Sequence, residues 1–138
     1  FTQWDEKADE LDEFRASGIR SKEDIRKPFV DRFYFGCEAD DRMIPWAFDT
    51  KLNRMGARLK AIFSSDIGHW DVIDATECLA ESYELMEHGF ISADDMRDFT
   101  FANSVELHGS TNPDFFKGTI IEGPAREVLQ AGQRTAAE

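Results

Sequence analysis

Apolar residues recur at helical spacing over most of this chain, and two short continuous apolar runs interrupt the pattern. A first helix is predicted over residues 1–17, from apolar positions three or four apart with charged residues between them: Trp4, Ala8, Leu11 and Phe14. A second, short helical piece is expected to begin after Ser21, a good N-cap residue, and to be interrupted at Pro28.

The two apolar runs are too short for helices and predict buried strands. One covers residues 32–37 and is followed by the polar residues 38–41, and the other covers residues 59–64. Between them, residues 44–56 keep a helical period, with Pro45 tolerable in the first turn and Gly56 at the end.

The second half of the chain is mainly helical in pattern. Helices are predicted over residues 75–89, where Gly89 ends the first, and from Ser92 to about residue 107. Residues 118–123 are expected to be extended, residues 124–130 to form a last helical turn or two, and residues 131–138 to be a frayed tail.

This order of elements is typical of parallel β-α units, since a helix separates the two strands. Two strands alone make a marginal sheet in water. A complete (β/α)8 barrel needs about 250 residues, and this chain has 138. We therefore expect an α/β fold, a helix-rich piece of a TIM (β/α)8 barrel with about two parallel strands, folded as one unit over residues 1–138. The absence of an initial Met fits a chain that starts within something larger.

Composition and charge exclude several classes of partner. The 28 acidic and 16 basic residues give a net charge of −12, which disfavours nucleic acid and anionic membrane surfaces. No apolar stretch is long enough to span a bilayer, and the first residues lack the pattern of a signal peptide. The two cysteines suit a reducing compartment, so a cytoplasmic location is expected.

The most informative chemistry lies just after the second predicted strand, where Asp66 is followed three positions later by His69. Active sites of parallel β/α proteins lie at that end of the strands. A carboxylate there could hold a metal ion or accept a proton, although an Asp at this position could equally cap the next turn. His69 could contact a ligand or hydrogen-bond its own loop.

Other polar groups have simpler interpretations. His88 and His108 each precede a glycine at a predicted helix end, where a cationic side chain suits the helix dipole. The acidic residues 38–41 could line a site or favour a helix start. Because a catalytic zinc needs three protein ligands and the three histidines are about 20 residues apart, this chain is not expected to assemble a metal centre by itself.

Several ordered segments resemble the C-terminal part of the amidohydrolase-related metal-dependent hydrolases, in the branch that includes aminocarboxymuconate-semialdehyde decarboxylase. The resemblance runs from about Pro28 to Thr119 and includes residues 33–41, 61–70, 101–109 and 111–118. In that branch the last barrel strand ends Gly-Ser-Asp-x-Pro-His, and residues 64–69, Ser-Ser-Asp-Ile-Gly-His, are similar to it. Residues 103–109 approximate the closing helix of the family.

The resemblance implies a barrel enzyme with a divalent metal, usually zinc, that hydrolyses an amide or ester or decarboxylates a small organic acid. It implies that Asp66 is the last-strand aspartate, which contacts the metal and handles a proton, and that His69 and Trp70 lie near the substrate. The family's metal-binding histidines belong to earlier strands that this chain lacks. The isolated chain is therefore expected to be inactive, to hold no metal alone, and to self-associate over its open strand edges.

The sequence leaves two alternatives open. A self-contained helical interaction module would also have a helix-rich second half and an acidic surface, and it predicts an antiparallel strand pair where the barrel predicts a parallel one. A phosphoacceptor domain would use Asp40, Asp41 and Asp66, but that architecture needs about five strands.

Overall fold

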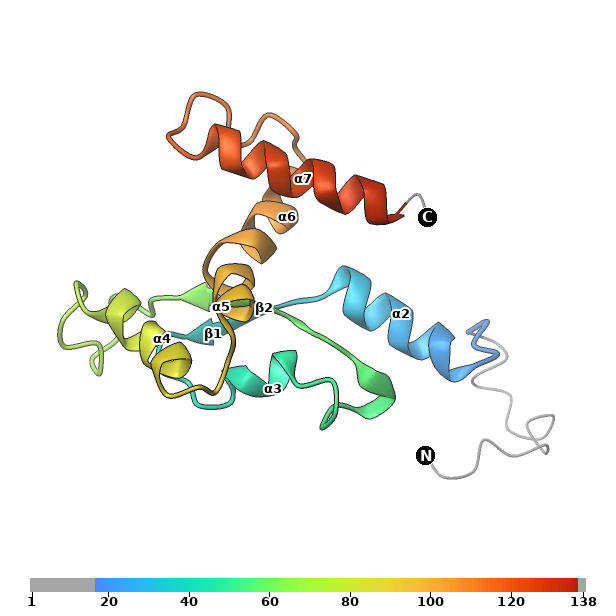
Figure 1. Cartoon of the computed structure of the whole chain (residues 1–138), viewed down its shortest axis with the longest axis horizontal. Coiled ribbons are helices and arrows are strands. Elements are labelled where there is room, and N and C mark those ends of the chain that lie inside the picture. Colours follow the sequence, from blue (N-terminus) through green and yellow to red (C-terminus); the bar gives the residue numbers. More distant parts are fainter. Residues whose placement is uncertain (1–16, 137–138) are drawn as a thin grey trace. The chain divides into compact units, whose positions relative to one another are not determined.

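We describe a computed structural model of the chain, in which residues 17–136 are described (Figure 1). The residue contacts divide the chain into two compact units, Phe1–Phe33 and Tyr34–Glu138, and each is described by itself. Almost all of the predicted first helix lies outside the described residues.

The first unit contains helix α2 (Lys22–Arg32). Ser21 caps it, because its hydroxyl accepts the Asp24 N–H, and the Asp24 carboxylate in turn accepts from the Arg20 N–H. The predicted interruption at Pro28 is wrong: the helix continues through Pro28 to Arg32. Proline removes one backbone hydrogen bond, but its fixed φ is helical, and the capped start and the residues after it sustain the helix.

The second unit is built on two parallel strands, β1 (Tyr34–Glu38) and β2 (Lys60–Ser64). Their register runs from Tyr34 opposite Lys60 to Glu38 opposite Ser64. The mixed α/β architecture with a parallel strand pair is thus confirmed. Both strands begin and end within two residues of the predicted apolar runs. A parallel pair requires a crossover connection, which residues 39–59 supply.

That connection is less helical than predicted. Helix α3 (Ile44–Phe48) ends after five residues, and a short 3-10 turn, η1 (Arg54–Gly56), follows. The Asp49 carboxylate accepts the N–H groups of Lys51 and Leu52, and so competes with the helical hydrogen bonds there. The prediction of one helix over residues 44–56 is therefore wrong.

Four helical elements follow β2: helices α4 (Cys78–Glu87) and α5 (Ala93–Arg97), the π-helix η2 (Asp98–Ala102) and helix α6 (Asn103–Gly109). The predicted cap at Ser92 is confirmed as a capping box with Asp95. Gly89 ends α4 with a φ of 73°, which glycine adopts readily.

The last helix, α7 (Glu122–Ala136), is longer than predicted. It begins inside the stretch that was predicted to be extended, and it continues to residue 136 through most of the predicted frayed tail, so both predictions are wrong. The Glu122 carboxylate accepts the Gly118 N–H and the Arg126 guanidinium, which supports the start of the helix.

The core lies on one face of the sheet, under η2 and its neighbours. Ala61 and Phe99 are fully buried there, and the ring of Phe63 meets that of Phe99 edge-to-face at 6.0 Å. Side chains alternate along a strand, so Lys60, Ile62 and Ser64 belong to the opposite face of β2. The face with Ala61 and Phe63 thus carries the apolar core, whereas on the other face Lys60 is paired with Glu106 of α6 at 2.9 Å.

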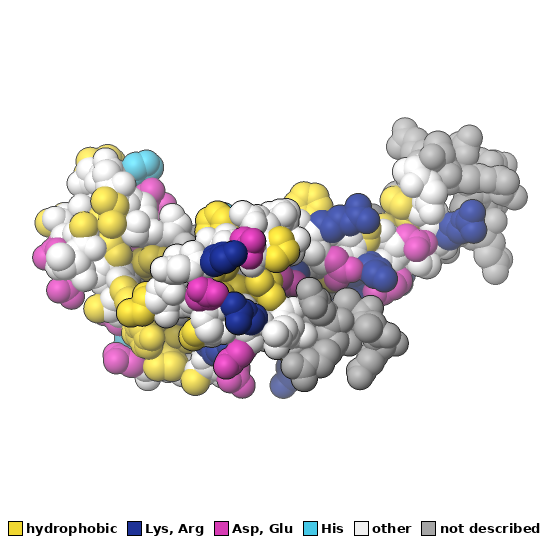
Figure 2. Space-filling view, turned by 90° about the horizontal axis from the view of Figure 1, so that it is seen from above, with side chains coloured by type: hydrophobic (Ala, Val, Ile, Leu, Met, Phe, Trp, Pro, Cys, Tyr) yellow, Lys and Arg dark blue, Asp and Glu magenta, His cyan; other side chains and the backbone are white. Residues whose placement is uncertain are grey.

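Within residues 17–136, no helix combines the length and apolar character needed to cross a membrane. On the face shown in Figure 2, acidic and basic side chains are interspersed with hydrophobic ones.

Candidate functional site

Asp66 lies two residues beyond β2, at the edge of the sheet where β1 also ends. Its backbone adopts φ 51°, in the left-handed region that Asp tolerates better than most residues. Its side chain is 24% exposed, so the carboxylate is partly withdrawn from water. The sequence predicted this placement at a strand end, but not the left-handed turn.

His69 is bonded to Asp66 twice. Its ring nitrogen Nδ1 lies 2.8 Å from Oδ2 of Asp66, and its backbone N–H donates to the Asp66 carbonyl at 3.2 Å. Gly68, with φ 108°, makes the tight return between them possible. The His69 side chain is 68% exposed. The loop therefore fixes the imidazole against the carboxylate and leaves the rest of the ring accessible.

Asp71 completes a group of three possible metal ligands. One ligand atom each from Asp66, His69 and Asp71 lies within 4.8 Å of the others. One imidazole and two carboxylates form a donor set that divalent cations accept. His69 and Asp71 are exposed, however, and a catalytic zinc site usually has three well-held protein ligands. Asp66 is the partly buried member of the three.

Trp70 and its neighbours form an exposed apolar rim on the same loop. The Trp70 side chain is 93% exposed, and those of Ile67 and Ile73 are exposed as well. Trp70 follows His69 directly, so the predicted substrate-contacting residue stands beside the polar pair, and its ring is accessible to a ligand.

The loop returns to the fold at the start of α4. The Asp74 carboxylate accepts both the backbone N–H of Thr76, at 2.9 Å, and its hydroxyl, at 2.6 Å. These bonds lower the pKa of Asp74. Cys78, two residues after Thr76, is buried. Its thiol sulfur lies 3.5 Å from the Ser65 carbonyl oxygen and 3.9 Å from the Asp74 carbonyl oxygen. The sequence indicates this thiol only through its place on the apolar face of α4.

The other polar candidates have local partners. Asp41 accepts the Met43 N–H at 2.8 Å ahead of α3. The ring of His108 stacks on that of Phe115 at 4.7 Å, and that of His88 meets Phe90 edge-to-face. In the described residues, neither of these two histidines joins a group of metal-ligating side chains.

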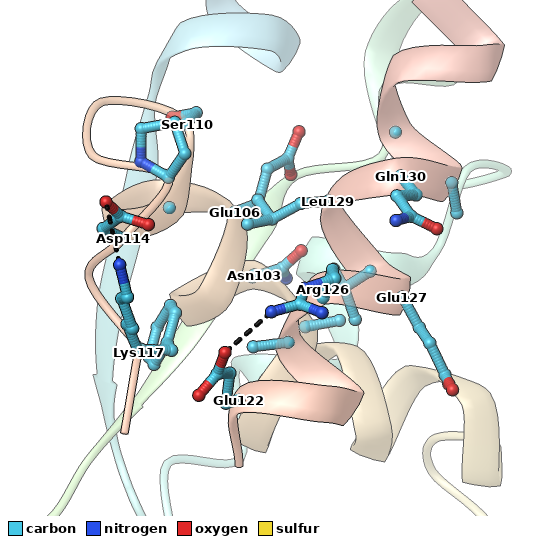
Figure 3. Close-up of a pocket in the computed structure, with 18 of the residues that line it drawn as sticks. Asn103, Glu106, Ser110, Asp114, Lys117, Glu122, Arg126, Glu127, Leu129 and Gln130 are labelled. Carbon is cyan, nitrogen blue, oxygen red and sulfur yellow. Dashed lines mark hydrogen bonds and ion pairs between the residues drawn. The ribbon is translucent and has the colours of Figure 1, made fainter. Parts of the chain in front are cut away.

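A separate groove of about 1150 Å³ lies between α6, the loop that follows it and α7 (Figure 3). Two ion pairs lie within it: Arg126 with Glu122 at 2.7 Å, and Lys117 with Asp114 at 3.9 Å. Asn103, at its base, donates to the Ala61 carbonyl at 2.8 Å. The sequence could not predict this groove, because it depends on how α6 and α7 cross. Asp66, His69 and Asp71 are not among its lining residues.

Comparison of the chain with protein-family models, curated proteins and solved structures finds no match. Its function must therefore be inferred from its own residues.

Proposed function

We propose that this chain forms two neighbouring strands of a metal-dependent, amidohydrolase-type (β/α)8 barrel and supplies Asp66 to its catalytic site. The observation that carries the proposal is the position of Asp66 beyond the second of two parallel strands, with its carboxylate partly withdrawn from water and bonded to His69. This is the end of a parallel sheet at which barrel enzymes place their catalytic groups. The resemblance of residues 64–69 to the family motif points to the same residue.

In this role Asp66 holds a divalent metal, for which zinc is the expected identity, together with histidines from other strands. The metal supplies Lewis-acid chemistry when bound. Asp66 accepts a proton at a carboxylate oxygen, while the contact with His69 orients that carboxylate. His69 and Trp70 contact the substrate, a small organic acid, amide or ester that is hydrolysed or decarboxylated without oxidation.

The isolated chain is proposed to be inactive and to hold no metal by itself. In the part of the chain that the structure describes, the group of possible ligands has one partly buried member, Asp66, and the open edges of the two-stranded sheet favour self-association. Nucleic acid and membrane surfaces remain disfavoured by the net charge of −12. The two free cysteines support a reducing compartment, and the cytoplasm is the proposed location.

The test is Asp66→Asn in a protein that carries this chain together with the remaining barrel strands. Asn keeps the shape and tolerates the left-handed backbone, but it neither binds a metal as an anion nor accepts a proton. Turnover of a panel of small amides, esters and carboxylic acids should fall by about 10²–10⁴-fold, with the melting temperature nearly unchanged. Asp94→Asn, an exposed acid in the first turn of α5, is the control. Unchanged kinetics in Asp66→Asn would refute the proposal.

The alternative, a helical interaction module without catalysis, draws support from the helix-rich second half and the acidic surface. The parallel register of β1 and β2 favours the barrel over the module.

A further inference from the structure

The loop that carries Asp66, His69 and Trp70 has little packing of its own. Of its apolar side chains, Trp70 is 93% and Ile73 is 96% exposed, Ile67 is exposed too, and Val72 is half-buried. Burial of such side chains is what usually holds a loop in one conformation. Its internal backbone bonds gather around His69, which donates to the Asp66 carbonyl and accepts the Val72 N–H. The rest of the loop must therefore be held at its two ends.

One buried side chain contacts both ends. The Cys78 thiol, 3% exposed, lies 3.5 Å from the carbonyl of Ser65, where the loop starts, and 3.9 Å from the carbonyl of Asp74, where it ends. A thiol has one weakly donated hydrogen, which these two carbonyls share. Cys78 is also the first residue of α4, and Ser82, one turn later on the same face, is fully buried. The anchor is thus fixed to a packed helix.

We propose that Cys78 is a positioning residue for Asp66: it fastens the base of the 66–77 loop and so keeps the Asp66 carboxylate against His69. The Ser65 carbonyl belongs to the peptide bond that joins Ser65 to Asp66, so a shift of this carbonyl also moves Asp66. The backbone of Asp66 adopts φ 51°, in the left-handed region. Loss of the thiol loosens the loop while β2 and α5 keep their packing. Its importance for catalysis rests on the proposed function, but the loop-fastening role does not.

The experiment is amide hydrogen exchange of the full chain, followed by mass spectrometry, on four variants. Cys78→Ala removes the donor, Cys78→Val removes it while filling the space, and Cys78→Ser keeps a donor. Cys37→Ala is the matched control, because Cys37 packs against the core and bonds to Phe35 rather than to the loop.

Exchange in residues 66–76, including the His69 N–H that donates to Asp66, should become several-fold faster in Cys78→Ala and Cys78→Val. Cys78→Ser and Cys37→Ala should stay near the parent chain, and exchange in β2 and α5 should change little in every variant. Equal loop exchange in Cys78→Ala, Cys78→Val and the parent overturns the proposal. Failure of both variants to fold also overturns it, since the thiol then supports the whole fold and not the loop.

A second readout ties the anchor to catalysis in the protein with the complete barrel. Cys78→Ala should lower kcat with little change in KM, and Cys78→Ser should restore it. If Asp66→Asn leaves turnover unchanged, the proposed function fails, whereas the exchange result still decides whether Cys78 fastens the loop.

Discussion

Gly109 and Leu129 lie so close that a Cβ on Gly109 would come within 2.6 Å of a Leu129 methyl carbon. Gly109 is the last residue of α6 and is buried, and Leu129 belongs to α7, so this contact is where the two helices approach. Gly109→Ala should therefore push the helices apart and destabilise the fold by about 1–3 kcal/mol, the usual cost of overpacking.

Thermal or denaturant unfolding measures this effect, and Gly132→Ala is the matched control. Gly132 also lies in α7, but a Cβ there would meet nothing within 4 Å. That replacement should leave stability unchanged or raise it by up to about 1 kcal/mol, because Ala favours the helix. Equal effects of the two replacements would contradict the close approach of α6 and α7.

Arg58 should be the most important ion-pairing residue in the second unit. Its guanidinium donates to Asp95 at 2.6 Å and to Asp98 at 2.9 Å, and lies 4.6 Å from the centre of the Phe48 ring. Arg58→Lys keeps the charge but cannot bond both carboxylates in the same way. We expect a loss of about 1–2 kcal/mol in unfolding free energy, modest because the side chain is 40% exposed.

Arg54→Lys, at an exposed arginine in η1, is the control for this measurement and should change stability by less than about 0.5 kcal/mol. If Arg58→Lys lowers the unfolding free energy no more than Arg54→Lys does, a single positive charge at position 58 stabilises the fold as well as the two hydrogen bonds of the guanidinium.

The sequence predicted those features of the fold that depend on residues close together along the chain. The strands and the Ser92 cap were predictable because their signals lie within a few residues. The placement of Asp66 followed from the end of an apolar run. The helix ends that the sequence did not predict depend on side chains that hydrogen-bond to the backbone, which a pattern of apolar spacing does not show. The Asp49 carboxylate ends α3, and the Glu122 carboxylate starts α7 earlier than the apolar positions suggest.

The site was predictable only in its polar centre. Asp66 and His69 are three positions apart, so their contact could be anticipated. Cys78 is twelve positions from Asp66, and its contact with the Ser65 carbonyl depends on how α4 packs beside β2. The groove beside α7 depends in the same way on the crossing of two helices, which no local pattern reports.

Stability should fall at high pH through Tyr34 and Lys60. Burial, followed by the nearby Glu106 carboxylate, raises the pKa of the Tyr34 hydroxyl. Burial lowers the pKa of Lys60, but the hydrogen bond and charge of Glu106, at 2.9 Å, outweigh it and raise that pKa overall. A pKa raised on folding contributes stability below the unfolded pKa, and this contribution is lost as the pH rises through the folded value. The loss should therefore occur above about pH 10.

Denaturant unfolding between about pH 8 and pH 12 checks this expectation. Tyr34→Phe should flatten the alkaline decline in part, whereas Tyr83→Phe, at an exposed position on α4, should leave it as in the parent chain. A decline that Tyr34→Phe does not alter would exclude Tyr34 as a cause.

At low pH, Asp95 should be a source of acid sensitivity. Burial raises the pKa of its carboxyl, but hydrogen bonds from Ser92 and from Arg58 outweigh this and hold the pKa below its ordinary value. A lowered pKa contributes stability above the unfolded pKa, near 4, and the contribution disappears as the pH falls through the folded value. Asp95→Asn should therefore reduce stability at neutral pH and make the acid decline shallower, as measured by unfolding across that range. An acid decline as steep as that of the parent chain would show that other carboxyl groups cause it.

Self-association should cover the open side of the sheet. In the described part of the chain the sheet consists of β1 and β2 alone, and Ile62 lies on the face opposite the core, beside Gly36, where a Cβ would meet nothing within 4 Å. Two open strand edges next to an apolar residue favour pairing with a second copy. Analytical ultracentrifugation at micromolar concentration should therefore show a dimer or larger species. Ile62→Lys should shift it toward monomer without loss of secondary structure, whereas Ile120→Lys, at a side chain 99% exposed in the loop before α7, should not. A well-folded monomer in the parent chain would contradict this expectation, and it would mean that the two strands are stable without neighbours on their open side.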